Sequence, residues 1–153
     1  MAEKNADGLD PRPMIGVGLM IRNDMGQVLM GLRCGSHGAD LWALPGGALE
    51  MGEDLIGTAR REALEETGLT VGQPELVSVY EELEYLRSNG KHFIDFGFVA
   101  PYLGGTPQIL EPEKCREWRW FDPGNMPANI YPAARITIEA ALTGRIFTSC
   151  LHR

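Results

Sequence analysis

Cysteines are scarce in this sequence: there are three among 153 residues, far apart and without a CxxC pair. Cys34, Cys115 and Cys150 therefore argue against a disulfide framework or a cysteine zinc site, and they favour a reducing compartment. Basic residues are also few, 14 Lys and Arg against 21 Asp and Glu, so the formal net charge is −7. This balance argues against nucleic-acid partners and anionic membrane surfaces, since both need basic patches. A phosphate substrate stays possible when a divalent cation neutralises its charge.

No apolar run in the sequence is long enough to cross a bilayer. The longest, residues 14–21, is interrupted by glycines and falls far short of the roughly 20 residues that a membrane helix needs. Residues 1–13 are polar and lack the apolar core of a signal peptide. We therefore predict a flexible leader over residues 1–13, a single domain over residues 14–153, no membrane partner and a cytoplasmic location.

Hydrophobic patterning predicts more strands than helices. Strands are expected at residues 15–21, 28–33, 41–44, 76–86, 91–102 and 117–121, and helices at residues 54–67 and 132–143. Turn-forming residues at 23–26 join the first two strands as a hairpin, and residues 88–90 turn the chain between the two long strands. Because only one helix lies among the strands, the pattern predicts an α/β fold with a mixed sheet flanked by two helices.

Residues 54–67 carry the strongest functional signal. Glu62, Glu65 and Glu66 are spaced i, i+3 and i+4, so a helix places all three on one face. Three like charges on one face destabilise a solvated helix, and a bound cation would relieve their repulsion. The functional hypothesis is a divalent metal site; its alternative is a solvated acidic surface with no catalytic role.

The residues around this acidic face form a spaced pattern. Gly47, Glu53 and the run REALEETGL at residues 61–69 resemble the signature of the Nudix (MutT-like) hydrolases, with every fixed position filled. The resemblance implies an α/β/α sandwich with a mixed sheet, in which a loop–helix–loop carries the catalytic residues. It also implies attack of water on a diphosphate linked to another group, with Mg²⁺ as the cofactor and Mn²⁺ as a substitute. Mg²⁺ suits hard carboxylate oxygens, keeps several waters and shares substrate phosphates.

The same resemblance implies a set of metal ligands. Glu62 and Glu66 are the leading ones, Glu65 comes next, and the backbone carbonyl of Gly46 is similar in position to a family ligand. Gly46 and Gly47 have no side chains, so the chain can pass close to a metal or a phosphate. Gly47 is accordingly expected to take part in substrate binding.

Glu53 and Arg61 complete the pattern. The resemblance implies that Glu53 contacts metal-bound water or orients Arg61, and that Arg61 is a structural ion-pair partner rather than a phosphate ligand. The expected catalytic carboxylates are Glu53, Glu62 and Glu65, but the identity of the general base stays open. Its candidates are Glu62, Glu65 and two carboxylates outside the pattern, Glu113 and Glu117.

A second segment bears on the substrate. Residues 111–120, EPEKCREWRW, resemble a segment of small eukaryotic cytosolic nucleoside triphosphate pyrophosphatases and their bacterial relatives. This similarity implies a homodimer that converts (deoxy)nucleoside triphosphates to monophosphate and pyrophosphate. Ala43 stands where some members carry a glutamine that reads guanine, which argues against strict guanine recognition. Trp118 or Trp120 is expected to stack on a base or, alternatively, to pack in the core.

Two other functions fit the same pattern. One is hydrolysis of a nucleoside diphosphate linked to a sugar or a similar group. The other is a nucleotide-binding sensor that does not hydrolyse its ligand. The intact set Glu62, Glu65 and Glu66 argues against the sensor.

Overall fold

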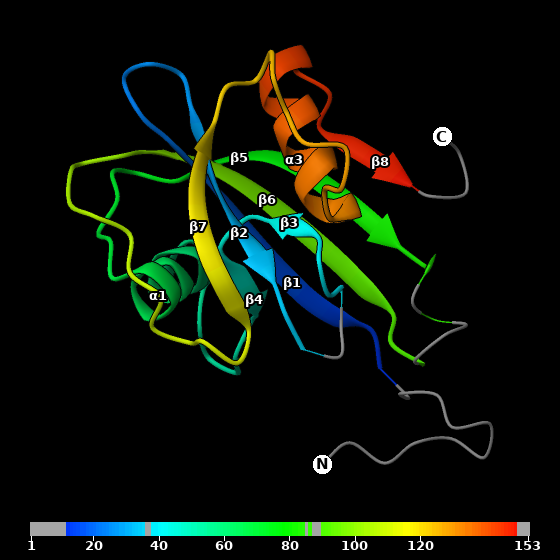
Figure 1. The fold of residues 1–153 in the computed structure, drawn as a ribbon. Helices are drawn as coiled ribbons and strands as arrows, with labels where there is room; N and C mark the ends of the chain where they lie inside the picture. Colours follow the sequence, from blue (N-terminus) through cyan, green and yellow to red (C-terminus); the bar gives the residue numbers. More distant parts are fainter. Residues whose placement is uncertain (1–11, 36–37, 85, 87–89, 150–153) are drawn as a thin grey trace.

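Figure 1 shows the computed structural model, which describes residues 12–35, 38–84, 86 and 90–149. Residues 1–11 of the expected leader, residues 88–89 of the expected turn, and Cys150 lie outside the described residues. In chain order the elements are β1 (Met14–Arg22), β2 (Val28–Arg33), β3 (Trp42–Ala43), β4 (Gly46–Ala48), α1 (Leu55–Thr67), β5 (Glu75–Glu82), β6 (Phe93–Pro101), β7 (Cys115–Phe121), α3 (Pro132–Thr143) and β8 (Phe147–Ser149).

One mixed sheet organises the chain. Its strands run in the order β3-β2-β1-β6-β5-β8, with β4 also paired to β1 and β7 paired to β2. β1 lies parallel to β6 along its whole length, from Met14 beside Phe93 to Arg22 beside Pro101. The other partners of β1, which are β2 and β4, are antiparallel to it. The expected mixed sheet is confirmed.

The two helices cover opposite faces of this sheet (Figure 1). Successive side chains of a strand point to opposite faces, and β1 shows the consequence. Leu19 and Ile21 pack with Ala63 of α1, whereas Met20 packs with Ile138 of α3. The predicted α/β/α sandwich is therefore confirmed. Within the described part of the chain, each helix is too short or too polar to span a membrane.

Helix α1 is capped at both ends. The Asp54 side chain accepts a hydrogen bond from the Gly57 amide at 2.6 Å and caps the N-terminus. Gly68 adopts a left-handed conformation with φ of 76°, and its amide donates to the Leu64 carbonyl, which ends the helix. Ala63 is fully buried against the sheet, so the glutamates beside it lie at the edge of the helix–sheet interface.

The local expectations agree with the structure only in part. Sequence patterning misses β4, a three-residue strand with two glycines, because glycine has low strand propensity and only the pairing with β1 makes it a strand. The expected hairpin of β1 and β2 is confirmed, with Arg22 paired to Val28, and β4 pairs with β1 at residues 16–18. β5 ends at Glu82 rather than at residue 86, since the chain turns there.

Candidate active site

A cleft opens where β4 leads into α1. It has a volume of about 600 Å³, and the chain around residues 113–118 forms another of its walls. Glu62 and Glu66 line it from α1, and Gly46 and Gly47 line it from β4. These residues meet because β4 pairs with β1 and α1 packs on both strands. The fold therefore brings four of the predicted site residues to one place.

Glu66 lies against the backbone of β4. Its Oε1 accepts a hydrogen bond from the Gly46 amide at 3.2 Å. Burial, together with the neighbouring Glu62 carboxylate, raises the pKa of Glu66 to about 9. A divalent cation bound between these carboxylates would favour the ionised form of Glu66.

Glu62 lies directly against Gly47. A Cβ at position 47 would collide with the carboxylate of Glu62 where it now lies, so glycine leaves room for this position of the carboxylate. A Cβ at position 46 would likewise collide with the Val17 carbonyl oxygen, so the close pairing of β4 with β1 also requires glycine. The two glycines thus bring the β4 backbone against the acidic face of α1.

Arg61 ties the neighbouring carboxylates together. Its Nε donates to Glu53 Oε2 at 2.6 Å, and one terminal nitrogen donates to Glu53 Oε1 at 3.0 Å. The other terminal nitrogen donates to Glu62 Oε1 at 2.9 Å and to Glu65 Oε2 at 3.2 Å. Charge-assisted, bidentate hydrogen bonds of this kind fix geometry strongly. The guanidinium therefore holds Glu62 in place while it also binds Glu65.

Glu53 has both oxygens occupied. Besides Arg61, the Thr58 hydroxyl donates to its Oε1 at 2.7 Å. The hydrogen bonds from Arg61 and Thr58 lower the pKa of Glu53 to about 2. A carboxylate that stays ionised to such low pH is poorly suited to accept a proton in catalysis. The geometry favours the second of the two expected roles, which is to orient Arg61.

Glu65 shares the helix face but does not line the cleft in the described structure. Its side chain is 51% exposed and pairs with Arg61. Among the described residues, no three metal-ligating side chains converge on one point. From α1, Glu62 and Glu66 line the cleft beside Gly46. Two carboxylates fit Mg²⁺, because this ion keeps several waters and takes further ligands from substrate phosphates.

The carboxylates outside the sequence pattern lie in different places. Glu113 lines the cleft, whereas Glu117 pairs with Arg119 at 2.7 Å and does not line it. Lys114 also lines the cleft and pairs with Glu111 at 3.3 Å, which raises the pKa of the lysine. Basic side chains on the cleft wall are Arg33, Lys91 and Lys114. The cleft therefore carries both the carboxylates that a metal needs and the cations that phosphates attract.

Trp118 and Trp120 lie on the same face of β7. Trp118 borders the cleft, and its ring packs so tightly on Gly31 that a Cβ there would come within 2.7 Å of it. Trp120 packs edge-on against Tyr102, with ring centroids 5.0 Å apart. Both contribute to the core between α1 and the sheet. Core packing thus describes Trp120, whereas Trp118 also reaches the cleft.

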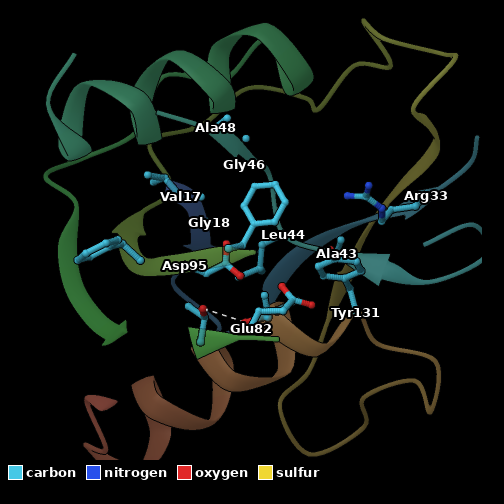
Figure 2. Close-up of a pocket in the computed structure, with 17 residues that line it drawn as sticks. Val17, Gly18, Arg33, Ala43, Leu44, Gly46, Ala48, Glu82, Asp95 and Tyr131 are labelled. Carbon is cyan, nitrogen blue, oxygen red and sulfur yellow. Dashed lines mark hydrogen bonds between the residues drawn. The ribbon is translucent and has the colours of Figure 1, made fainter. Parts of the chain in front are cut away.

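A second cavity continues from this cleft toward α3. It measures about 210 Å³ and shares Arg33 and Gly46 with the cleft. Figure 2 shows Glu82 and Asp95 in this cavity, with Arg33 and Tyr131 to one side. Sequence patterning does not single out this acidic pair, because its members lie on two strands that are separate in the sequence, and only the pairing of β5 with β6 brings them together. Glu82 lies two residues after Tyr80, which is buried, so both side chains fall on the same face of the strand. An acidic residue on a buried face is the feature of the sequence that points to this site.

Comparison with known proteins agrees with this geometry. The model of the NUDIX domain family matches residues 12–141. An RNA pyrophosphohydrolase from Novosphingobium aromaticivorans is 31% identical over 146 residues, which cover 84% of this chain and 88% of the relative. The NAD-capped RNA hydrolase NudC from Stutzerimonas stutzeri is 28% identical, over 92% of this chain and 49% of its own length. The crystal structure of a MutT NUDIX hydrolase from Burkholderia pseudomallei has a TM-score of 0.78 at 29% identity, covering 84% of this chain and 98% of that one.

Proposed function

The chain belongs to the Nudix hydrolase family, and we propose that it converts (deoxy)nucleoside triphosphates to monophosphate and pyrophosphate with Mg²⁺. The resemblance drawn from its sequence is thereby confirmed, and the protein is a pyrophosphohydrolase of the Nudix kind. Nudix hydrolases generally use divalent metal ions such as Mg²⁺. The substrate and the roles of individual residues are our proposal.

The observation that carries this proposal is the continuity of the two cavities. The larger one places Glu62 and Glu66 beside basic side chains, which suits a metal-bound phosphate chain. The smaller one is walled by apolar side chains, among them Leu44 and Phe93, with a few polar groups. Such a lining is typical of pockets for small organic ligands. A nucleotide has a phosphate chain at one end and a base at the other, so its two parts match the larger and the smaller cavity.

The geometry supports the following assignment of residue roles. Glu62 and Glu66, with the backbone at Gly46, would hold the Mg²⁺ ion, and Glu53 and Arg61 would keep Glu62 oriented. When bound, the ion would lower the pKa of a water molecule and neutralise charge that develops on the phosphates. The proton of the attacking water would pass to a carboxylate; among the expected candidates, Glu62 and Glu113 line the cleft, whereas Glu65 and Glu117 do not. Gly47 leaves room for the substrate, and Trp118 borders it.

A second candidate substrate is RNA that carries a triphosphate end. Several relatives named RNA pyrophosphohydrolase favour it, at 27–32% identity, and its terminal nucleotide has the same triphosphate–nucleoside chemistry. The net charge of −7 argues against extended contacts with the RNA backbone. The free nucleotide therefore remains our first proposal.

A substrate panel tests these alternatives. The protein would be incubated with Mg²⁺ and nucleoside triphosphates, a triphosphorylated RNA oligonucleotide or nucleoside diphosphate sugars, and the products identified. We expect a free triphosphate to give the highest kcat/KM, with pyrophosphate as product and activity abolished by a chelator. Faster cleavage of the RNA, or of a nucleotide sugar, would replace the proposed substrate. Nucleotide binding without turnover would indicate the non-hydrolysing sensor.

The single domain, the homodimer and the cytoplasmic location stay predictions. The homodimer rests on the resemblance of residues 111–120 to small nucleoside triphosphate pyrophosphatases. Light scattering behind a sizing column, at micromolar protein, would measure the mass directly. We expect the mass of two chains, and the mass of one chain would contradict the homodimer.

A further inference from the structure

Glu82 and Asp95 form a buried carboxyl pair that the hydrolytic chemistry does not use. Glu82 stands at the end of β5 and is only 1% exposed, and Asp95 lies within β6. In the register of these strands Asp95 is opposite Tyr80, so Glu82, two residues further, lies diagonally across on the same face. Figure 2 shows both side chains in the smaller cavity.

Each carboxyl group has one buried oxygen without a partner. Glu82 Oε1 and Asp95 Oδ2 make no hydrogen bond within the described residues. Burial and the adjacent Asp95 raise the pKa of Glu82 to about 9, and burial raises the pKa of Asp95 as well. The pair is therefore harder to ionise than two separate carboxyl groups, and its two buried oxygens, which have no partners among the described residues, face the cavity as acceptors. Buried acceptors without partners are unfavourable, so this arrangement points to a ligand that supplies two donors.

The surrounding chain leaves room for such a ligand. A Cβ at position 16 would collide with Asp95 Oδ1, so Gly16 allows this carboxyl group to lie over β1. Phe93 and Leu44 line the cavity with apolar surface, and Arg33 lies where the cavity joins the cleft. Apolar walls for the faces of a ring and polar groups for its edge are the usual features of a base pocket.

We propose that Glu82 and Asp95 read the Watson–Crick edge of guanine in a nucleotide whose phosphates lie at Glu62 and Glu66. Guanine places two neighbouring donors on this edge, the N1–H and the 2-amino group, and these match two neighbouring acceptors. Adenine and cytosine place one amino group next to a ring acceptor, and uracil has one N–H between two carbonyls. The inference rests on the proposed function, because it supplies the nucleoside half of that substrate.

This assignment changes the expectation drawn from Ala43. The missing glutamine at that position argued against strict guanine recognition, because a site without a polar partner loses discrimination. The acidic pair supplies such partners from β5 and β6 instead. Guanine would then be recognised by Glu82 and Asp95, which lie on a different part of the sheet from Ala43.

Equilibrium binding of nucleoside monophosphates tests the ligand side of the proposal. GMP and IMP differ only in the 2-amino group, so their ratio isolates one of the two donors. We expect GMP to bind at least about tenfold more tightly than IMP, AMP, CMP or UMP, as a hydrogen bond to a charged acceptor predicts. Equal affinities for GMP and IMP would overturn the assignment without any change to the protein.

Two variants test the protein side. Glu82→Gln and Asp95→Asn each replace one acceptor by an amide, and each should reduce the preference for GMP over AMP to within about threefold. Glu81→Gln is the matched control, because Glu81 is the neighbouring carboxylate of β5 and does not line the cavity; its preference should equal wild type. A full preference in both folded cavity variants would overturn the proposal. If neither variant folds, the GMP to IMP ratio of the wild-type protein decides.

Binding needs no turnover, so the two proposals fail separately. Guanine-selective binding without cleavage of any triphosphate would contradict the proposed function and support the base site. Cleavage of several triphosphates with equal monophosphate affinities would overturn the base site and leave the proposed function intact.

Discussion

The cleft and the smaller cavity that continues from it each hold a pair of carboxyl groups, and the two pairs have different surroundings. We call the cleft at Glu62 and Glu66 the phosphate end, and the smaller cavity at Glu82 and Asp95 the base end. At the phosphate end, Glu62 and Glu66 lie beside Arg61 or basic cleft residues and can share a cation. At the base end, Glu82 and Asp95 lie among apolar side chains and keep two unpaired acceptor oxygens within the described structure. On our proposals, these surroundings decide what each carboxyl pair would bind: a metal with phosphates at one end and neutral N–H donors at the other.

The largest effect is expected at the phosphate end. Glu66→Gln keeps the side-chain volume but removes the charge of a proposed metal ligand, so we expect kcat to fall by about 10²-fold or more. Steady-state kinetics with a nucleoside triphosphate measure this loss. Glu139→Gln, an exposed carboxylate of α3, is the control and should leave the rate unchanged. Near wild-type activity in Glu66→Gln would remove Glu66 from the site.

A smaller loss should follow when the β4 backbone is altered. In Gly47→Ala the new Cβ would collide with the Glu62 carboxylate and displace it. Because small misplacements of catalytic groups are costly, we expect kcat/KM to fall on the order of 10-fold to 10²-fold. Gly124→Ala is the control, since a Cβ there meets nothing within 4 Å. Equal activity of the two variants would show that Glu62 adjusts freely.

At low pH the phosphate end should lose stability. The native pKa of Glu53 is lowered from 4.5 to about 2, mainly by Arg61. The ionised group therefore stabilises the fold above pH 4.5, and this contribution is lost as pH falls toward 2. Urea unfolding of Glu53→Gln should show a weaker loss of stability across this window than wild type. If the unfolding free energies of the variant and the wild type fell equally with pH, the ion pair with Arg61 would not stabilise the folded state.

At the base end the sign is reversed. Burial and the adjacent Asp95 raise the pKa of Glu82 from 4.5 to about 9, with Glu84 adding to the rise and Arg33 opposing it. Between these values the unfolded chain releases a proton that the native state keeps, so wild-type stability declines with rising pH. Glu82→Gln should remove part of this decline and raise Tm at pH 8 by about 2–4 °C. An unchanged pH dependence would show that Glu82 is ionised in the folded protein.

The phosphate end could be predicted from the sequence because its geometry is local. The spacing of Glu62, Glu65 and Glu66 puts them on one face of any helix, and Asp54 and Gly68 define the ends of that helix. Spacing does not show where each side chain turns. Glu65 faces Arg61 rather than the cleft, and this depends on ion pairing within the folded network.

The base end could not be predicted, because it depends on contacts between distant segments. Glu82 and Asp95 meet through the register of β5 with β6, which includes an irregularity between Leu76 and Ser78. A shift of one residue would turn either carboxylate to the other face of the sheet. The strand β4 was missed for a related reason, because pairing with β1 rather than propensity makes it a strand.

The central claim is that one nucleotide spans both ends of the cleft. A crystal structure of the wild-type protein with Mg²⁺ and a GTP analogue, in which a methylene group replaces the oxygen between the α- and β-phosphorus atoms, tests it most directly. We predict that the phosphates lie beside Glu62 and Glu66 and that the guanine edge contacts Glu82 and Asp95. A base outside the smaller cavity, or phosphates away from α1, would contradict the account.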